Sequence, residues 1–341
     1  MCKTVMPWSK IQIAAIAALS AAMSGCGGGG GGGDDNPPTP TLIDITAANR
    51  DDVAHFTAAG LMALPTTGGS FGMIPLAAGR TKAAGWSVAP MSMLLLSLRA
   101  QGVAASGNRR QALAVSNTSY PCDFGGSVAE SFDDRDGSGT ISVGDVETMV
   151  YTNCMISADE TMNGTARLTV SQIGTASASF QMDLASYADS TPQHSLTVNG
   201  SVMLGLSTPS STIMQTTLTT SGPVVVAVNT HLPFSDTVTL QDGFAMVESY
   251  DGQVGQSSST FAGRLHSVLA DGMVDANTVA GAPMTLNAAD DYPSAGAVRI
   301  KGGTGTLMLN AVSSASVRLD LDTDDDGVIE SSTTQSWDWL I

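Results

Sequence analysis

The sequence predicts a mainly β protein, in which a long antiparallel meander forms a curved sheet or half-barrel with two N-terminal helices packed on it. Beyond residue 107 the chain is dominated by Thr, Ser, Val and Gly, and short apolar runs recur roughly every ten to fifteen residues. The dipeptides Asn163-Gly164, Asn199-Gly200 and Asp242-Gly243 match the turns of two-residue β-hairpins. No helical pattern separates these runs, as it would in a parallel sheet. A β-sandwich is the alternative.

Strands are expected where β-prone residues stand between turn signals. The segment Ser195–Leu206 matches a complete hairpin that turns at Asn199-Gly200. A similar alternation follows Asn163-Gly164, which suggests repeated hairpins. The expected strands are Ala112–Val115, Val146–Tyr151, Ala166–Ile173, Phe180–Tyr187, Ser195–Val198, Val202–Leu206, Met214–Thr219, Val224–Val228, Thr237–Leu240, Phe244–Tyr250, Phe261–Val268, Val298–Lys301, Thr306–Leu309 and Val317–Leu321.

Two helices are expected before the strands. Thr46 is a good N-cap for a helix over about 47–64, in which Val53 and Phe56 share one stripe and which Pro65 ends.

The second helix begins at Pro90 and ends at Gly102. Its apolar residues cover most of the circumference, so we expect it to be buried inside a curved sheet. That arrangement is similar, by analogy, to the folds of periplasmic lipoprotein carriers.

The N-terminus has the pattern of an export signal. Lys3 and Lys10 precede an apolar stretch, Ile11–Met23, that is too short for a stop-transfer helix. The tetrapeptide ending at Cys26, Met-Ser-Gly-Cys, resembles the lipobox of bacterial lipoproteins, with Met in place of the usual Leu. The resemblance implies that the signal is cleaved before Cys26 and that this cysteine carries lipid. The alternative is an ordinary secretory signal with a chance cysteine.

A tether follows the cysteine. Gly27–Gly33 is an unbroken glycine run and Asp34–Pro40 is rich in proline; neither composition can build a core. In lipoprotein families an Asp directly after the cysteine favours the inner membrane. Here that position is Gly27, so the resemblance points to an outer-membrane lipoprotein of the cell envelope, facing either the periplasm or the surface.

These segments divide the chain into four parts. They are a signal peptide (1–25), a lipidated cysteine and tether (26–40), a helical segment (41–110) and a β-rich region (111–341) that forms one domain with the helices.

Charge excludes one class of partner. Acidic residues outnumber basic ones 31 to 14, and the net charge is −17. Removal of residues 1–25 takes away two lysines and no acid, so the mature charge becomes −19. Such a surface repels phosphate backbones, which argues against nucleic-acid binding and leaves the lipid anchor as the expected membrane contact.

Two of the four cysteines are available for a disulfide. Cys2 leaves with the signal peptide and Cys26 carries the lipid, which leaves Cys122 and Cys154 in an oxidising compartment. We expect these two to be bonded. The alternatives are two free buried thiols or, with less support, a zinc site.

No enzyme signature is present. The sequence has no GxSxG elbow, HExxH helix or Walker loop, and its four histidines stand alone. Lone histidines in strands and turns are more often structural than catalytic. We therefore assign no catalytic residue and no organic cofactor.

Two acidic loops are candidate calcium sites. The first, Asp134–Asp145, resembles the loop of EF-hand and dockerin proteins and would use Asp134, Asp136, Ser138 and Asp145, with glycine at its sixth position. Ser138 replaces an acidic or amide ligand and Asp145 replaces the usual glutamate, and strands flank the loop. The alternative is a polar turn without metal.

The second loop has the DxDxDG core of many extracellular calcium loops. Its expected ligands are Asp322, Asp324, Asp326 and Glu330, because the twelfth position is Thr333 and the full EF-hand spacing fails. Four carboxylates within five residues repel one another unless a cation is bound. The alternative is a solvated acidic hairpin tip.

Taken together, these features resemble a group of uncharacterised proteobacterial lipoproteins. The resemblance rests on the lipobox and polyglycine run, the cysteine-bracketed Asp134–Asp145 loop, the Tyr292–Gly296 segment (YPSAG), the Leu319–Gly327 hairpin and Trp337 near the end. It implies the envelope address and the β-rich fold, and no activity.

The leading hypothesis is a non-enzymatic envelope lipoprotein that serves as a structural or binding module for an unknown protein or other ligand. A carrier of lipid or another apolar ligand on the concave face of the sheet is the second hypothesis, and an unrecognised hydrolase is the third. An open apolar cavity would favour the carrier, and a filled core the structural module.

Overall fold

The computed structural model describes residues 41–70, 116–192, 194–230, 235–287, 290 and 292–340. They belong to one compact unit, Pro40–Ile341. No helix among them is both long and apolar enough to cross a membrane. The signal peptide, Cys26, the tether, the second expected helix and the expected strand Ala112–Val115 lie outside the described residues.

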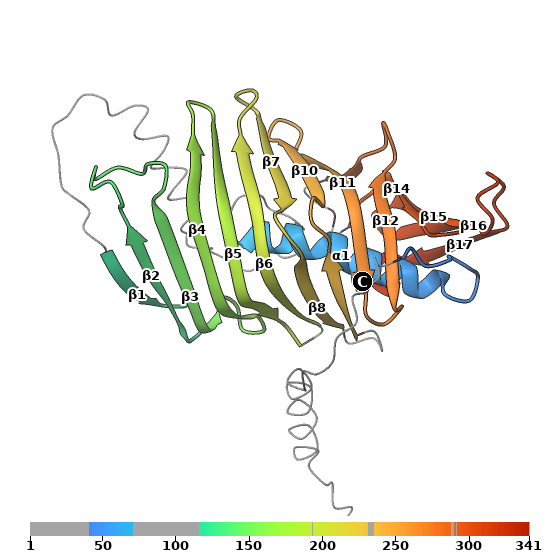
Figure 1. The fold of residues 1–341 in the computed structure, drawn as a ribbon, viewed down its shortest axis with the longest axis horizontal. Coiled ribbons are helices and arrows are strands. Elements are labelled where there is room, and N and C mark those ends of the chain that lie inside the picture. Colours follow the sequence, from blue (N-terminus) through green and yellow to red (C-terminus); the bar gives the residue numbers. More distant parts are fainter. Residues whose placement is uncertain are drawn as a thin grey trace, which may run out of the picture. The chain divides into compact units, whose positions relative to one another are not determined.

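One antiparallel sheet of 17 strands contains every described strand (Figure 1). The mainly β, antiparallel meander is therefore confirmed, and the strands do not divide into the two sheets of a sandwich. The strands are β1 Ser116–Pro121, β2 Ser127–Asp133, β3 Val146–Met155, β4 Thr161–Ile173, β5 Ser177–Ser190, β6 His194–Ser207, β7 Ile213–Thr220, β8 Val224–Thr230, β9 Ser235–Leu240, β10 Ala245–Asp251, β11 Gln256–Ser267, β12 Gly272–Thr278, β13 Met284–Asn287, β14 Ala297–Lys301, β15 Thr306–Ser313, β16 Ser316–Asp322 and β17 Ser331–Ser336.

Several of these strands are halves of longer, interrupted ones. β6 pairs with β7 along its second half and with β8 along its first half. β9 and β10 together line one edge of β11, and β12 and β13 line its other edge. Where a strand is interrupted, its neighbour pairs with both halves, so the described chain runs up and down and each long strand lies beside the one that precedes it and the one that follows it.

The three Asx-Gly dipeptides are not hairpin turns, and here the sequence prediction is wrong. Asn163-Gly164 lies inside β4, Asn199-Gly200 lies inside β6, and Asp242-Gly243 lies between β9 and β10. Ser195–Leu206 is accordingly one continuous strand and not a hairpin.

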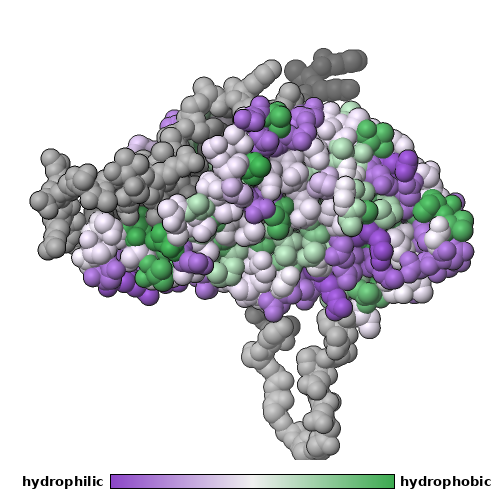
Figure 2. All heavy atoms as spheres, turned by 90° about the horizontal axis from the view of Figure 1, so that it is seen from above, coloured by the Kyte–Doolittle hydropathy of each residue, from purple (hydrophilic) through white to green (hydrophobic). Residues whose placement is uncertain are grey.

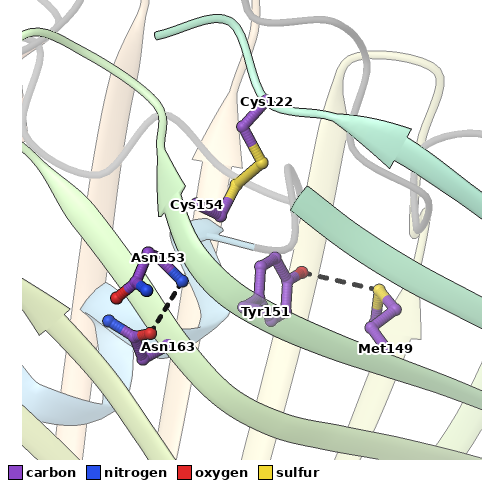
Figure 3. Close-up of a disulfide and its surroundings, with 6 residues drawn as sticks. All are labelled: Cys122, Met149, Tyr151, Asn153, Cys154 and Asn163. Atoms are coloured by element: carbon purple, nitrogen blue, oxygen red, sulfur yellow. Dashed lines mark hydrogen bonds between the residues drawn. A yellow bond between two sulfur atoms is a disulfide. The ribbon is translucent and has the colours of Figure 1, made fainter. Parts of the chain in front are cut away.

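Asn163-Gly164 and Asn199-Gly200 instead sit opposite β-bulges in β3 and β5, and Asp242-Gly243 sits opposite the break between β7 and β8. The side-chain oxygens of Asn163, Asn199 and Asp242 accept hydrogen bonds at 2.7–2.8 Å from the backbone N–H groups of Asn153, Ser186 and Gly222 respectively. All three donor residues have positive φ, at 46°, 47° and 121°. The Asn153–Asn163 bond is drawn in Figure 3. The repeated hairpins that the sequence suggested are therefore absent from this part of the structure, and each dipeptide lies instead at a kink in a pair of strands.

The glycines of these dipeptides are required by close backbone approach. A Cβ atom on Gly164, whose φ is 96°, would lie 2.1 Å from the carbonyl oxygen of Ser186. A Cβ on Gly200 would lie 2.9 Å from the carbonyl oxygen of Pro223. Only glycine fits where the bulged strand folds over its neighbour, so the bends follow directly from the sequence.

Helix α1, Arg50–Ser70, lies behind the strands in Figure 1. It contacts β8, β9 and β11 and also β15, so the sheet curves around it. Its stripe was predicted correctly at Val53 and Phe56, which are buried. A Cβ on Gly60 would come within 3.1 Å of Val238, so the helix backbone rests close to β9.

Both ends of α1 differ from the prediction. The helix begins at Arg50, because Asn49 accepts a 2.8 Å hydrogen bond from the backbone N–H of Thr46 and holds Thr46 in the preceding turn. The helix also continues past Pro65 to Ser70.

A short helix, α3 (Trp337–Leu340), follows the last strand and contacts α1. His55 Nδ1 lies 3.0 Å from the carbonyl oxygen of Leu340, and the His55 ring lies 4.4 Å from that of Trp339. Trp337 is buried, and its indole N–H donates to the carbonyl oxygen of Ser313. The end of the chain is therefore packed into the core.

Candidate metal centres

A disulfide lies at the end of the β2–β3 hairpin that is opposite to the first acidic loop. Cys122 and Cys154 are bonded, with their Cα atoms 5.4 Å apart, as the sequence predicted. Figure 3 shows that the bond joins the turn after β1 to β3. Cys154 is buried. The strand order β1–β2–β3 brings the two cysteines together, because β1 and β3 both pair with β2.

Loop 1 is the connection Asp134–Asp145 between β2 and β3. The Asp134 carboxylate accepts hydrogen bonds from the backbone N–H groups of Ser138 and Gly139, at 3.1 and 2.8 Å. Asp136 accepts from the Ser138 N–H at 2.9 Å. Hydrogen bonds from Ser138 lower the pKa of the Asp136 carboxyl to about 2. The loop therefore wraps around its own carboxylates.

Asp145 closes loop 1 from its C-terminal end. Its side chain is fully buried, and its two oxygens accept from the backbone N–H groups of Arg135 at 3.0 Å and Ser142 at 2.7 Å. Oxygen atoms of Asp134, Asp136 and Asp145 all lie within 4.8 Å of one another. Ser138, the fourth expected ligand, directs its hydroxyl to the carbonyl oxygen of Thr140 at 2.8 Å.

Loop 2, Asp322–Glu330, connects β16 to β17. Oxygens of Asp322, Asp324, Asp326 and Glu330 lie within 4.8 Å of one another, which is the set that the sequence singled out. Asp322 is buried and the other three are exposed. The Asp322 carboxylate accepts from the N–H of Gly327 at 2.9 Å, just as Asp134 accepts from Gly139 in loop 1.

The fifth acidic residue of loop 2 is turned away from the cluster. Asp325, with φ of 63°, accepts hydrogen bonds at 2.7 Å from Lys301 on β14 and from the Thr306 hydroxyl on β15. The hydrogen bond from Lys301 is the main cause of the lowered pKa of the Asp325 carboxyl. The expected repulsion is thus partly relieved by a base that lies 24 residues away in sequence and adjacent in the sheet.

Both clusters could hold a metal ion. Each gathers three or more carboxylate oxygens at one strand-to-strand connection, and oxygen is the ligand type that hard cations such as Ca²⁺ and Mg²⁺ prefer. The flanking elements are strands, so neither loop belongs to the helix pair of an EF-hand.

Sequence reasoning missed two acidic residues on the buried face of the sheet, Glu147 on β3 and Glu248 on β10. Burial and the nearby Glu130 raise the pKa of Glu147 to about 7, and burial alone raises that of Glu248 to about 7. One carboxyl oxygen of each, Glu147 Oε2 and Glu248 Oε1, is buried without a hydrogen-bond partner. No motif marks these residues, because their neighbours come from other strands.

A groove lies on the opposite face of the sheet from α1. It has a volume of about 340 Å³ and is lined by small apolar side chains, among them Ala245, Val247, Ala262, Val279 and Pro283. Ala245 and Ala262 alternate with the buried Met246 and Phe261, which places the groove on the outer surface.

Comparison of the chain with protein-family models, with curated proteins and with solved structures gives no match.

Proposed function

We propose that the protein is an exported, lipid-anchored component of the bacterial cell envelope, and that its sheet serves as a non-enzymatic structural or binding module whose two acidic loops take up Ca²⁺. The observation that carries the proposal is the Cys122–Cys154 disulfide, which encloses loop 1. Disulfides persist in oxidising compartments and are rare in the bacterial cytosol, so this bond agrees with the export signal.

A packed interior supports a structural or binding module over a carrier. The large side chains of Phe56 on α1 and of Met149 and Phe180 on the inner face of the sheet are at most 1% exposed. The groove of about 340 Å³ lies on the outer face, where a carrier that wraps its ligand in the concave face would not hold it. In Figure 2, hydrophobic residues on the surface form several patches among hydrophilic ones.

A carrier of an apolar ligand remains the second candidate, and the outer groove is the observation that favours it. A hydrolase would need a serine and a histidine within hydrogen-bond reach in a cleft. Among the described residues no hydrogen bond joins a serine to a histidine.

Calcium is the metal that suits the two loops best. Asp322, Asp324 and Asp326 alternate along the chain and converge at its turn, and Gly327, with φ of 89°, lets the chain fold back over them. Sites of this kind in extracellular modules bind Ca²⁺ at roughly 10⁻⁴–10⁻³ M. Bound calcium would fix the β2–β3 and β16–β17 connections.

The anchor is tested by replacing Cys26 with serine. Cells that express the full chain are labelled with palmitate and fractionated. We expect the native chain to take up label and to sediment with the outer membrane, and the Cys26→Ser variant to lose the label and leave the membrane fraction. A Cys2→Ser variant is the matched control and should behave like the native chain. Equal labelling of all three would refute the anchor.

A further inference from the structure

The buried face of the first three strands carries an unusual group of side chains. Tyr120 on β1, Glu130 on β2, and Glu147 and Tyr151 on β3 all lie on this face, because register pairs Tyr120 with Val128 and Val128 with Tyr151. Glu130 and Glu147 occupy diagonal positions across the β2–β3 pair, opposite Met149 and Phe132. Diagonal neighbours are within reach of side chains of this length.

Contacts within the group show that its members meet. The Tyr120 hydroxyl donates to Glu130 Oε2 at 3.2 Å. Burial, and after it the neighbouring Glu130 carboxyl, raise the pKa of Glu147. Glu147 is 93% buried, and its Oε2 meets no hydrogen-bond donor. No lysine or arginine among the described residues pairs with either glutamate.

Two carboxyl groups this close, with one oxygen unsatisfied, require a positive charge or a shared proton between them. The side chains around the two carboxyl groups indicate whether the positive charge belongs to a metal ion or to an organic cation. Hard divalent cations take six to eight oxygens, and this group offers two carboxylates and phenols. Its other members are the rings of Tyr120, Tyr151 and Phe132, and Tyr151 stands edge-on to Tyr187 with centroids 5.8 Å apart. Aromatic rings beside carboxylates suit an ammonium group.

We propose that Glu130, Glu147 and Tyr120 form a binding site for an organic ammonium group on the buried face of β1–β3. The ammonium nitrogen donates to the two carboxylates, and its carbon substituents lie against the rings. Tyr120, Glu130 and Phe132 are half-buried, so the group enters past them from the β1 edge and reaches Glu147, which is buried. The inference goes beyond the proposed anchor and calcium loops and depends on neither.

The site is tested by calorimetric titration of the full chain with n-propylammonium chloride, in EDTA and at about 0.15 M salt. EDTA removes any contribution of calcium, so a failed calcium proposal does not affect the result. We expect saturable binding, and we expect Glu147→Gln and Glu130→Gln each to weaken it by roughly tenfold or more, as the loss of a hydrogen bond between charged groups does.

A matched control comes from the other strands. Glu248 is also buried on the inner face with one unsatisfied oxygen, but among the described residues no neighbouring carboxylate contributes to its raised pKa. Glu248→Gln should bind n-propylammonium as the native chain does, and 1-propanol, the neutral analogue, should not bind. Tyr120→Phe, which keeps the ring and loses the hydroxyl, should weaken binding less than either glutamate variant.

Two further ligands identify the source of the ammonium group. Nα-acetyl-lysine methylamide carries it on a peptide side chain, and O-phosphoethanolamine carries it on a lipid headgroup; binding of either supports the site and names its source. The proposal is overturned if n-propylammonium gives no heat, if Glu147→Gln and Glu130→Gln bind it as tightly as Glu248→Gln, or if 1-propanol binds equally well. In a separate titration without EDTA, binding of CaCl₂ in place of the amine, with the same dependence on Glu130 and Glu147, would also overturn it.

Discussion

The two acidic loops share a first turn and differ in how they deal with their charge. In both, the first aspartate accepts from the N–H of the glycine five residues later. Loop 1 then buries Asp145 and satisfies both of its oxygens with backbone donors. Loop 2 leaves Asp324, Asp326 and Glu330 exposed and close together. Loop 1 is therefore organised by its own hydrogen bonds, and loop 2 has more to gain from a cation.

The largest expected effect on stability comes from the disulfide, which is present only in the part of the chain that contains loop 1. Loop 1 is enclosed by a disulfide between cysteines 32 residues apart, and no disulfide involves loop 2. Replacing both Cys122 and Cys154 by alanine should lower the free energy of unfolding by about 3.7 kcal/mol in the chain-entropy account. Urea unfolding in EDTA measures this, and the calcium response of loop 2 should survive. An unchanged urea midpoint would show that the loop is organised without the bond.

Calcium should stabilise the protein mainly through loop 2, and less through loop 1. A ligand that binds only the folded state stabilises it by about 2.7 kcal/mol at a hundredfold excess over its dissociation constant. We expect a melting-temperature increase in millimolar CaCl₂ relative to EDTA. Most of it should disappear in the Asp324→Ala, Asp326→Ala double variant, and less in Asp134→Ala.

Two outcomes would contradict this ranking. A shift that survives the double variant and disappears in Asp134→Ala would make loop 1 the stronger site. No shift and no heat of binding would return both loops to acidic turns without metal.

The buried carboxyl of Glu248, outside the loops, avoids a buried negative charge by keeping its proton. The stability of the protein should therefore depend on pH. Burial raises the pKa of Glu248 from 4.5 to about 7. The folded state therefore binds more protons than the unfolded state between these values, and its stability falls as pH rises through them. The loss is about 3 kcal/mol. Urea midpoints from pH 4.5 to 8 in EDTA should fall less in Glu248→Gln than in the native chain; equal slopes would show that Glu248 stays ionised.

The smallest expected effect concerns Lys301, the lysine on β14 that pairs with Asp325 of loop 2. Lys301 and Asp325 are about two-fifths exposed, so Lys301→Met should lower the stability of the fold only slightly. The same change frees a negative charge beside the cluster and should tighten calcium binding by about two- to fivefold. Arg167→Met breaks the similarly exposed Arg167–Asp183 pair and should leave calcium affinity unchanged. Weaker calcium binding in Lys301→Met would mean that this lysine positions the loop.

The sequence predicted what depends on local pattern. The β class, most strand positions, the disulfide and the membership of both acidic clusters follow from residues close together in the chain. The Lys301–Asp325 pair could not be foreseen, because it forms only when β14 and the β16–β17 connection become neighbours. The same holds for Glu130 and Glu147, which stand 17 positions apart in the sequence.

The Asx-Gly dipeptides show where a correct local signal leads to a wrong structure. Asn-Gly readily adopts positive φ, and a two-residue turn is the commonest place for it. In this sheet the dipeptide lies within a strand, and backbone atoms of the next segment along the chain, at Ser186 for Gly164 and at Pro223 for Gly200, leave no room for a Cβ. The prediction of extended chain on both sides of Asn199-Gly200 is correct, and only the direction of the chain after Gly200 is wrong.

The bulges also help to fix the register in which neighbouring strands pair during folding. Strands rich in Ser, Thr and Gly have weak preferences for one pairing over another, and a slip by two residues keeps every side chain on its own face. Here a slipped strand would place a residue with a Cβ where only Gly164 or Gly200 fits, and would separate the Asn163 or Asn199 amide from the one N–H group it bonds. Each kink therefore selects one alignment of its strand pair from several alignments that would bury nearly equal apolar area.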